Sequence, residues 1–133
     1  MEECIFCRII KHQQEACIVY EDDTVIAFLD SDPINTGHVL LVPKDHYLDV
    51  DELPEELLIH ISKVSQKIVK AIKATFHPDG YSAIQCGGMF NDIGHYHLHL
   101  FPRYKEDGFG WKDTILESYT SDKIARQIME QIE

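Results

Sequence analysis

The residues best suited to chemistry are three histidines spaced two apart, in the run His95-Tyr96-His97-Leu98-His99-Leu100-Phe101. Successive side chains of a β-strand point to opposite faces, so this spacing predicts three imidazoles on one face, roughly 6.5 Å apart. Buried imidazoles are costly unless their nitrogens are paired, which favours a functional site over a plain core. Such a face could ligate a catalytic metal that keeps an open position for water. Alternatively, one imidazole could attack phosphorus while its neighbours bind phosphate oxygens.

Cysteines form a second candidate group, because Cys4 and Cys7 make a C-x-x-C pair while Cys17 and Cys86 stand alone. In a reducing compartment we expect the two lone cysteines to be thiols. A redox pair normally follows a strand and opens a helix in a βαβ unit, and this pair lies almost at the N-terminus. A zinc ribbon needs a second closely spaced pair. A third interpretation is a mixed Cys₂His₂ zinc site completed by distant histidines.

Length and charge limit the class of protein. A chain of 133 residues suits one domain with its own core, and the formal net charge of −11 disfavours nucleic acid as a partner. That charge leaves room for a small phosphorylated ligand, because backbone N–H groups and histidines can reverse the field inside one pocket. The chain has no apolar stretch of membrane-spanning length, and Met1-Glu2-Glu3 is unlike a secretory signal. We expect a soluble cytoplasmic protein with no membrane contact.

Periodicity predicts the elements that must position these residues. The predicted strands cover residues 17–20, 24–29, 38–42, 81–85 and 95–103, the third ending at Pro43. Apolar residues recur at steps of three or four from Leu53 to Phe76, which predicts a long helix with Pro54 in its first turn. A short helical turn is expected at 7–11. Ser121 is expected to cap a C-terminal helix with Ile124, Ile128 and Ile132 on one face. The order favours an antiparallel α+β sheet.

The histidine run resembles the H-φ-H-φ-H-φ-φ signature of the histidine-triad (HIT) family. Similarity to the family continues over nearly the whole chain, in Cys4–Ile10, Ala27–Asp30, Gly37–His46, Phe101–Tyr104 and Asp107–Gly110. The resemblance implies a single HIT domain over residues 1–133. It implies a five-stranded antiparallel sheet with one long helix and a short C-terminal helix. It also implies a homodimer, in which we expect the long helix and the edge strand beside it to supply the contact.

The resemblance also implies roles for individual residues at a nucleotide site, with a purine nucleoside phosphate as the expected ligand. His97 would attack the α-phosphorus and form a nucleotidyl-histidine, with a backbone carbonyl accepting from its other ring N–H. His99 and His38 match positions that contact phosphate or the leaving group, and Asp30 matches a carboxylate that binds ribose hydroxyls. The implied activity is hydrolysis or transfer on a nucleoside phosphoramidate, acyl-nucleotide or dinucleoside polyphosphate. A catalytically weak nucleotide-binding module is the alternative.

A structural Zn²⁺ is implied by the same resemblance, with the ligands Cys4, Cys7, His46 and His95. His95 would then serve the metal while His97 serves the nucleotide. Because both would share one face of a regular strand, the backbone must twist near His95.

The chain departs from the family just before the triad, in the run Phe90-Asn91-Asp92-Ile93-Gly94. Asn91 stands near a position where family members commonly carry a glutamine that touches phosphate, and Asp92 stands where a hydroxyl is usual. Gln85 is the nearest candidate for a further polar ligand residue. An ionised Asp92 within about 5 Å of a phosphate would repel it. Either its side chain points away, or the substrate differs from the family norm. The remaining His12, His60 and His77 are expected to be solvated helix or turn residues.

Overall fold

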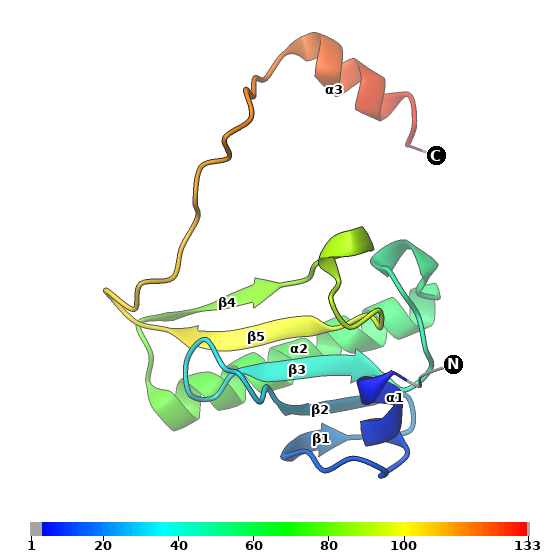
Figure 1. The fold of residues 1–133 in the computed structure, drawn as a ribbon, viewed down its shortest axis with the longest axis vertical. Coiled ribbons are helices and arrows are strands. Elements are labelled where there is room, and N and C mark those ends of the chain that lie inside the picture. Colours follow the sequence, from blue (N-terminus) through cyan, green and yellow to red (C-terminus); the bar gives the residue numbers. More distant parts are fainter. Residues whose placement is uncertain (1–3, 133) are drawn as a thin grey trace.

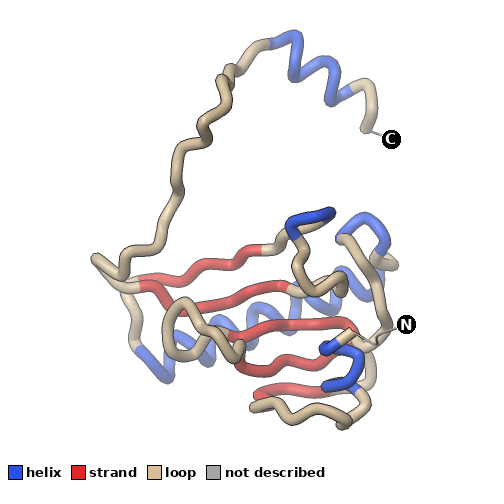
Figure 2. Tube along the Cα trace, in the orientation of Figure 1, coloured by secondary structure: helices blue, strands red, loops and turns tan. Residues whose placement is uncertain are grey.

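The computed structural model describes residues 4–132, and its centre is a five-stranded antiparallel sheet in the order β1-β2-β3-β5-β4 (Figures 1 and 2). The strands are β1 (Ile18–Glu21), β2 (Val25–Leu29), β3 (Val39–Pro43), β4 (Gly80–Ile84) and β5 (Leu98–Arg103). The first four lie within one residue of the predicted strands at each end. This confirms the predicted α+β class and antiparallel pairing.

The long helix α2 (Glu55–Phe76) covers one face of the sheet (Figure 1). Its buried side chains, Ile61, Val64, Ile68 and Ile72, repeat at helical spacing and pack against β3 and β5. Pro54 is the N-cap and lies just before the first turn, not inside it as predicted, because the helix begins at Glu55. His77, in the left-handed conformation with φ 48°, ends the helix.

A short helix, α1 (Ile5–Ile10), lies against the opposite face of the sheet (Figure 1). Phe6 and Ile9 are buried against Phe28 and Leu40, among other apolar residues of β2 and β3. The Cys4 sulfur accepts a hydrogen bond from the Cys7 N–H and caps this helix. The first helix therefore joins the C-x-x-C pair to the sheet face that carries the histidines.

The predicted strand over 95–103 is too long at its start, because β5 begins only at Leu98. The last residue pair between β3 and β5 is Leu41 with Leu98. Before it, the N–H of Tyr96 donates to the carbonyl of Tyr47 at 2.7 Å instead of to a neighbouring strand. The backbone before Leu98 is therefore not a regular strand, which provides the change of direction expected if His95 serves a metal and His97 a nucleotide.

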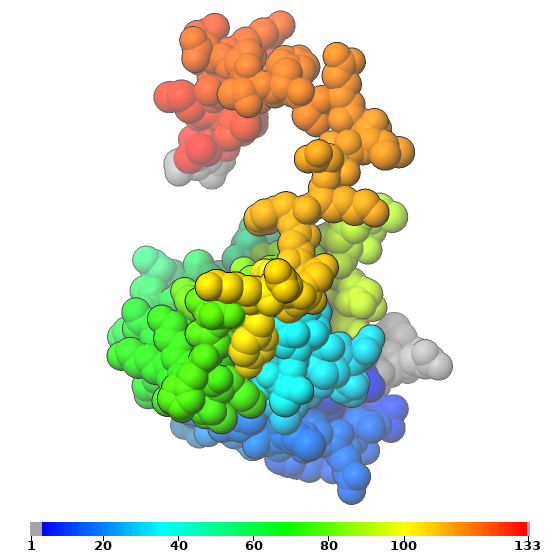
Figure 3. All heavy atoms as spheres, turned by 90° about the vertical axis from the view of Figure 1, so that its left-hand side faces the viewer, coloured from blue at the N-terminus to red at the C-terminus, as the bar shows by residue number. Residues whose placement is uncertain are grey.

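Beyond β5 the chain is held by contacts centred on Asp107 and then leaves the body of the protein. Arg103 donates from Nε and Nη2 to the two carboxylate oxygens of Asp107, at 2.7 and 3.0 Å. Residues 110–132, here called the C-terminal arm, extend away from the sheet and end in α3 (Asp122–Met129), as Figures 1 and 3 show.

The arm contains the predicted C-terminal helix, and the Ser121 side chain caps it by accepting from the Ile124 N–H. Its apolar face is uncovered, since Ile128 is 59% exposed and Ile132 is 71% exposed. Within residues 4–132, no helix combines the length and the apolar character needed to cross a bilayer.

Candidate functional site

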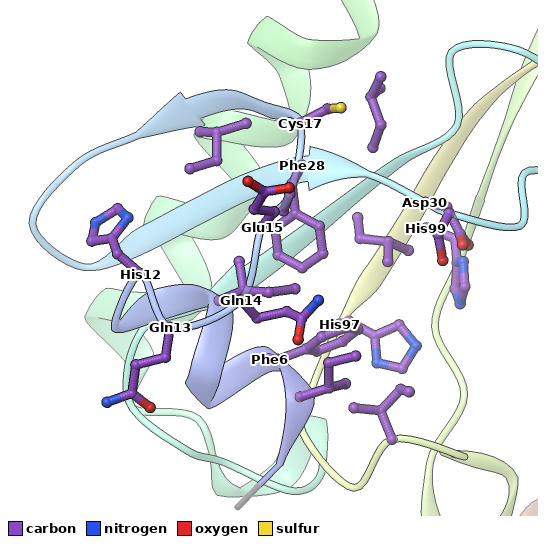
Figure 4. Close-up of a pocket in the computed structure, with 18 of the residues that line it drawn as sticks. Phe6, His12, Gln13, Gln14, Glu15, Cys17, Phe28, Asp30, His97 and His99 are labelled. Atoms are coloured by element: carbon purple, nitrogen blue, oxygen red, sulfur yellow. The ribbon is translucent and has the colours of Figure 1, made fainter.

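An open pocket of about 980 Å³ lies on the α1 side of the sheet (Figure 4). Phe6 and Ile9 of α1, Phe28 of β2 and Ile18 of β1 give it an apolar wall. In the view of Figure 4, Phe6 and Phe28 lie between the His12–Cys17 segment and the pair Asp30 and His99. The pocket therefore has an apolar part suited to a flat ring and a polar part suited to phosphate and hydroxyl groups.

His97 is held at the pocket by contacts on two sides. Its ring is 3% exposed and packs edge-on against Phe6, with ring centroids 5.2 Å apart. Its Nδ1 lies 2.9 Å from the carbonyl oxygen of His95, which can only accept, so Nδ1 carries the proton. The other nitrogen, Nε2, is left with a lone pair. The hydrogen bond that we predicted for the nucleophile is present.

His38 and His99 form a hydrogen-bonded chain below the pocket, and its direction follows from the backbone. The N–H of Ile34 donates to Nδ1 of His38 at 3.0 Å, so the proton of His38 is on Nε2. That Nε2 lies 2.9 Å from Nδ1 of His99 and donates to it. His99 in its neutral form therefore carries its proton on Nε2. Burial, and then the neighbouring His97 and His38, lower the pKa of His99 to about 4.

Asp30 lies at the end of the same chain. Its Oδ1 accepts from the Asp32 N–H at 2.9 Å, and its Oδ2 is 3.6 Å from Nε2 of His38. Asp30, His38 and His99 are close enough to suggest a metal site. The tautomers argue against one, because Nε2 of His38 carries a proton where a ligand needs a lone pair. This cluster is better suited to hydrogen bonding, and it weakens the catalytic-metal interpretation of the histidine face.

The structure brings only some of the predicted site residues to the pocket. His97, His99 and Asp30 line it, and His38 contacts it through His99. Asn91 is buried at 7% exposure and already satisfied, since its amide donates to the Leu48 carbonyl and accepts from two backbone N–H groups. Gln85 is not among the pocket residues.

The pocket wall also contains Asp92 and His12. Asp92 is exposed and lines the pocket, and its charge acts on the ring of His99. His12 also lines it, at a turn with φ 59°, and sequence reasoning missed this role because His12 belongs to no recognisable motif.

His60 also differs from expectation. Its Nε2 lies 2.7 Å from Oδ2 of Asp22, which also accepts from the Tyr20 hydroxyl at 2.7 Å. His60 therefore links α2 to the turn between β1 and β2 and is not a merely solvated helix residue.

The four residues Cys4, Cys7, His46 and His95 meet as predicted for a metal site, with their ligand atoms all within 4.8 Å of one another. Nε2 of the buried His95 lies 2.8 Å from the carbonyl oxygen of Pro43, which places its proton on Nε2. The lone pair on Nδ1 faces the other three ligand atoms. A backbone carbonyl that fixes the tautomer is typical of metal-ligating histidines.

The distances within this cluster fit a tetrahedral ion. Zn–S bonds near 2.3 Å and Zn–N bonds near 2.05 Å imply roughly 3.6 Å between sulfur and nitrogen ligands and roughly 3.3 Å between two nitrogens. The observed separations from Nδ1 of His95 are 3.5 Å to Cys4 Sγ, 3.6 Å to Cys7 Sγ and 3.2 Å to His46 Nδ1. Cys7 Sγ and His46 Nδ1 are 3.2 Å apart. The Cys7–His46 pair would need to open by about 0.4 Å, and the other three separations already match, so these residues could hold a metal with only a small adjustment.

Comparison with known proteins gives consistent matches. The HIT domain family profile matches residues 11–106. The crystal structure of a HIT family member from Bacillus subtilis has a TM-score of 0.87 and 36% identity, covering 99% of each chain. A Zn-bound histidine-triad protein from Mycobacterium smegmatis has a TM-score of 0.75 and 31% identity, covering 84% of this chain and 83% of its own.

Among curated sequences, the adenosine 5′-monophosphoramidase HNT1 of Candida albicans is 30% identical to this chain over an alignment of 138 positions. The match covers 97% of this chain and 91% of that protein.

Proposed function

Because this chain belongs to the HIT family, we propose that it is a nucleotide hydrolase or nucleotidyl transferase in which His97 attacks the α-phosphorus of a nucleoside phosphate. The observation that carries the proposal is the hydrogen bond from Nδ1 of His97 to the His95 carbonyl, which leaves Nε2 free to form a bond. A relative active on adenosine phosphoramidate supports the reaction class.

The proposed reaction has two steps. In the first, Nε2 of His97 bonds to phosphorus as the bond to the leaving group breaks, and in the second, water cleaves the nucleotidyl-histidine to release a nucleoside monophosphate. An amine leaving group takes up one proton, and the attacking water later gives up one. The Nε2–H of His99 is available to donate a hydrogen bond to the phosphate or the leaving group, because Nδ1 of that ring already accepts from His38.

The pocket offers matching surroundings for the rest of the nucleotide. Phe6, Ile9 and Phe28 provide an apolar surface for a base, and Asp30 keeps acceptor capacity for ribose hydroxyls. We place the phosphate at the pocket side of His97 and His99, within reach of both Nε2 atoms; the two rings pack edge-on, with centroids 4.8 Å apart.

We also propose that Cys4, Cys7, His46 and His95 hold a structural Zn²⁺. The fit of the ligand distances and the Zn-bound relative support this. All four protein ligands are present, so no open position remains for substrate, and the ion would stabilise the fold instead of acting in the reaction.

The test of the nucleophile uses an adenosine phosphoramidate with wild type, His97→Asn and the distant control His77→Asn. We expect His97→Asn to reduce turnover by several powers of ten while AMP still binds, because the bond-forming atom is removed. The control tolerates asparagine at its left-handed φ and should keep full activity. An acid-labile nucleotidyl adduct on wild-type His97 would support the proposal. Full turnover by His97→Asn would refute it, and an inert wild type that binds AMP would favour the binding-module alternative.

We further propose a homodimer. Among residues 4–132 no strand pairs with the outer side of the edge strand β4. Leu58 and Ile59 of α2 are exposed, and the arm carries uncovered apolar side chains such as the fully exposed Ile115. Sedimentation velocity at micromolar concentration tests this proposal, and a purely monomeric protein would contradict it.

A further inference from the structure

The charge of the pocket bears on the leaving group, which the proposed function leaves open. Its lining contains three carboxylates, Glu15, Asp30 and Asp92, and neither lysine nor arginine among residues 4–132. Pockets that bind several phosphates normally carry Arg, Lys or a metal ion to neutralise them. This pocket has the opposite balance.

Asp92 differs from Asp30 in having no hydrogen-bond partner among the described residues. Within the described chain no backbone or side-chain group hydrogen-bonds its oxygens, and the residue is exposed and lines the pocket. Burial dominates the lowered pKa of His99, but the charge of Asp92 acts in the opposite direction and raises it, so the carboxylate lies within Coulombic range of that ring.

The backbone around Asp92 is held in place. The buried side chain of Asn91 accepts from the N–H groups of Ile93 and Gly94, at 3.3 and 3.0 Å, and donates to the Leu48 carbonyl at 3.1 Å. Gly94 has a φ of +72°, which favours glycine. The buried amide therefore fixes the loop that presents Asp92 to the pocket.

Resting on the function proposed above, we infer that Asp92 determines leaving-group specificity by favouring a leaving group that carries an ammonium and disfavouring one that carries a further phosphate. Every candidate substrate brings the same nucleoside α-phosphate, so only the leaving-group charge differs between them. Amine phosphoramidates with a second amino group, and aminoacyl nucleotides, carry positive charge there. Dinucleoside polyphosphates carry negative charge and would be repelled.

The test compares wild type with Asp92→Asn, which keeps the shape and removes the charge. Three adenosine 5′-phosphate derivatives of similar size serve as probes: the 2-aminoethyl phosphoramidate, the propyl phosphoramidate and the methyl ester of ADP. The wild-type to variant ratio of kcat/KM cancels the intrinsic reactivity of each probe. Because the α-phosphate that all three probes share also feels the charge of Asp92, the ratio for the neutral propyl probe serves as the reference. Relative to that reference, unit charges a few ångströms apart in a partly solvated site predict a ratio about 3- to 20-fold higher for the cationic probe and about 3- to 20-fold lower for the anionic probe.

Asp113→Asn makes the same change of net charge on the exposed arm and should give ratios near one throughout. Equal Asp92→Asn ratios for all three probes would overturn the inference.

Binding separates this inference from the reaction itself. Asp92→Asn should strengthen binding of ADP relative to AMP by a similar factor, whether or not the protein turns over substrate. If wild type is inert and this shift occurs, the proposed reaction fails and the role of Asp92 stands. If turnover proceeds through His97 and neither ratio changes, only the role of Asp92 fails.

Discussion

Acid should destabilise this protein through His99, and the effect can be calculated. The ring is partly buried, and its Nδ1 already accepts from His38, so a second proton would set two N–H groups against each other. Burial first, and then His97 and His38, lower its pKa from 6.5 to about 4 in the folded state. Between these values the unfolded chain binds a proton that the folded chain does not, so stability falls as the pH falls. The loss is about 2 kcal/mol at pH 5 and approaches roughly 3.4 kcal/mol below pH 4.

Urea unfolding of wild type and His99→Asn between pH 8 and pH 5 measures this contribution. Asparagine keeps an acceptor for His38 but does not titrate, so the stability difference between the two proteins should change by about 2 kcal/mol over the range. Acid release of a bound metal would affect both proteins equally and cancels in the difference. A difference between wild type and His99→Asn that stays constant from pH 8 to pH 5 would refute the reasoning.

Three further outcomes are expected. Cys4→Ser should lower the thermal midpoint measured by circular dichroism. A chelator should lower the midpoint of wild type but not lower that of the variant further, because both changes remove the same proposed metal site. Equal chelator effects on the two proteins would contradict this. Ile61→Ala, at a position 2% exposed under the sheet, should cost about 2 to 5 kcal/mol in urea unfolding, and a loss below about 1 kcal/mol would be inconsistent with its packing. Asp107→Asn removes the charged acceptor of Arg103 where the chain leaves β5, so limited proteolysis should cut the arm sooner than in Asp113→Asn, and equal rates would rule that anchor out.

Much of the fold could be predicted because local patterns decide it. The helical spacing of Ile61, Val64, Ile68 and Ile72, and the apolar strands on either side, fix both the elements and their buried faces. The resemblance also named the four residues that meet in the candidate metal site, Cys4, Cys7, His46 and His95, since those residues belong to recognisable motifs.

Features that depend on tertiary hydrogen bonds could not be predicted. β5 begins late because Tyr96 pairs with Tyr47, a contact between distant segments that no local pattern reveals. Asn91 looked like a ligand residue, but its amide is used to hold the loop. Periodicity correctly predicted α3, but not that its apolar face would find no cover on the rest of the chain.

The arm gives the protein a built-in optical label. Trp111 is the only tryptophan of the chain, and it is fully exposed near the start of the arm. Its emission wavelength therefore reports the surroundings of the arm and should change little while the core unfolds. A blue shift of that emission with rising protein concentration would follow burial of the arm directly, and far-ultraviolet circular dichroism on the same sample would follow the sheet and helices. The two signals together separate docking of the arm from folding of the body without any added dye.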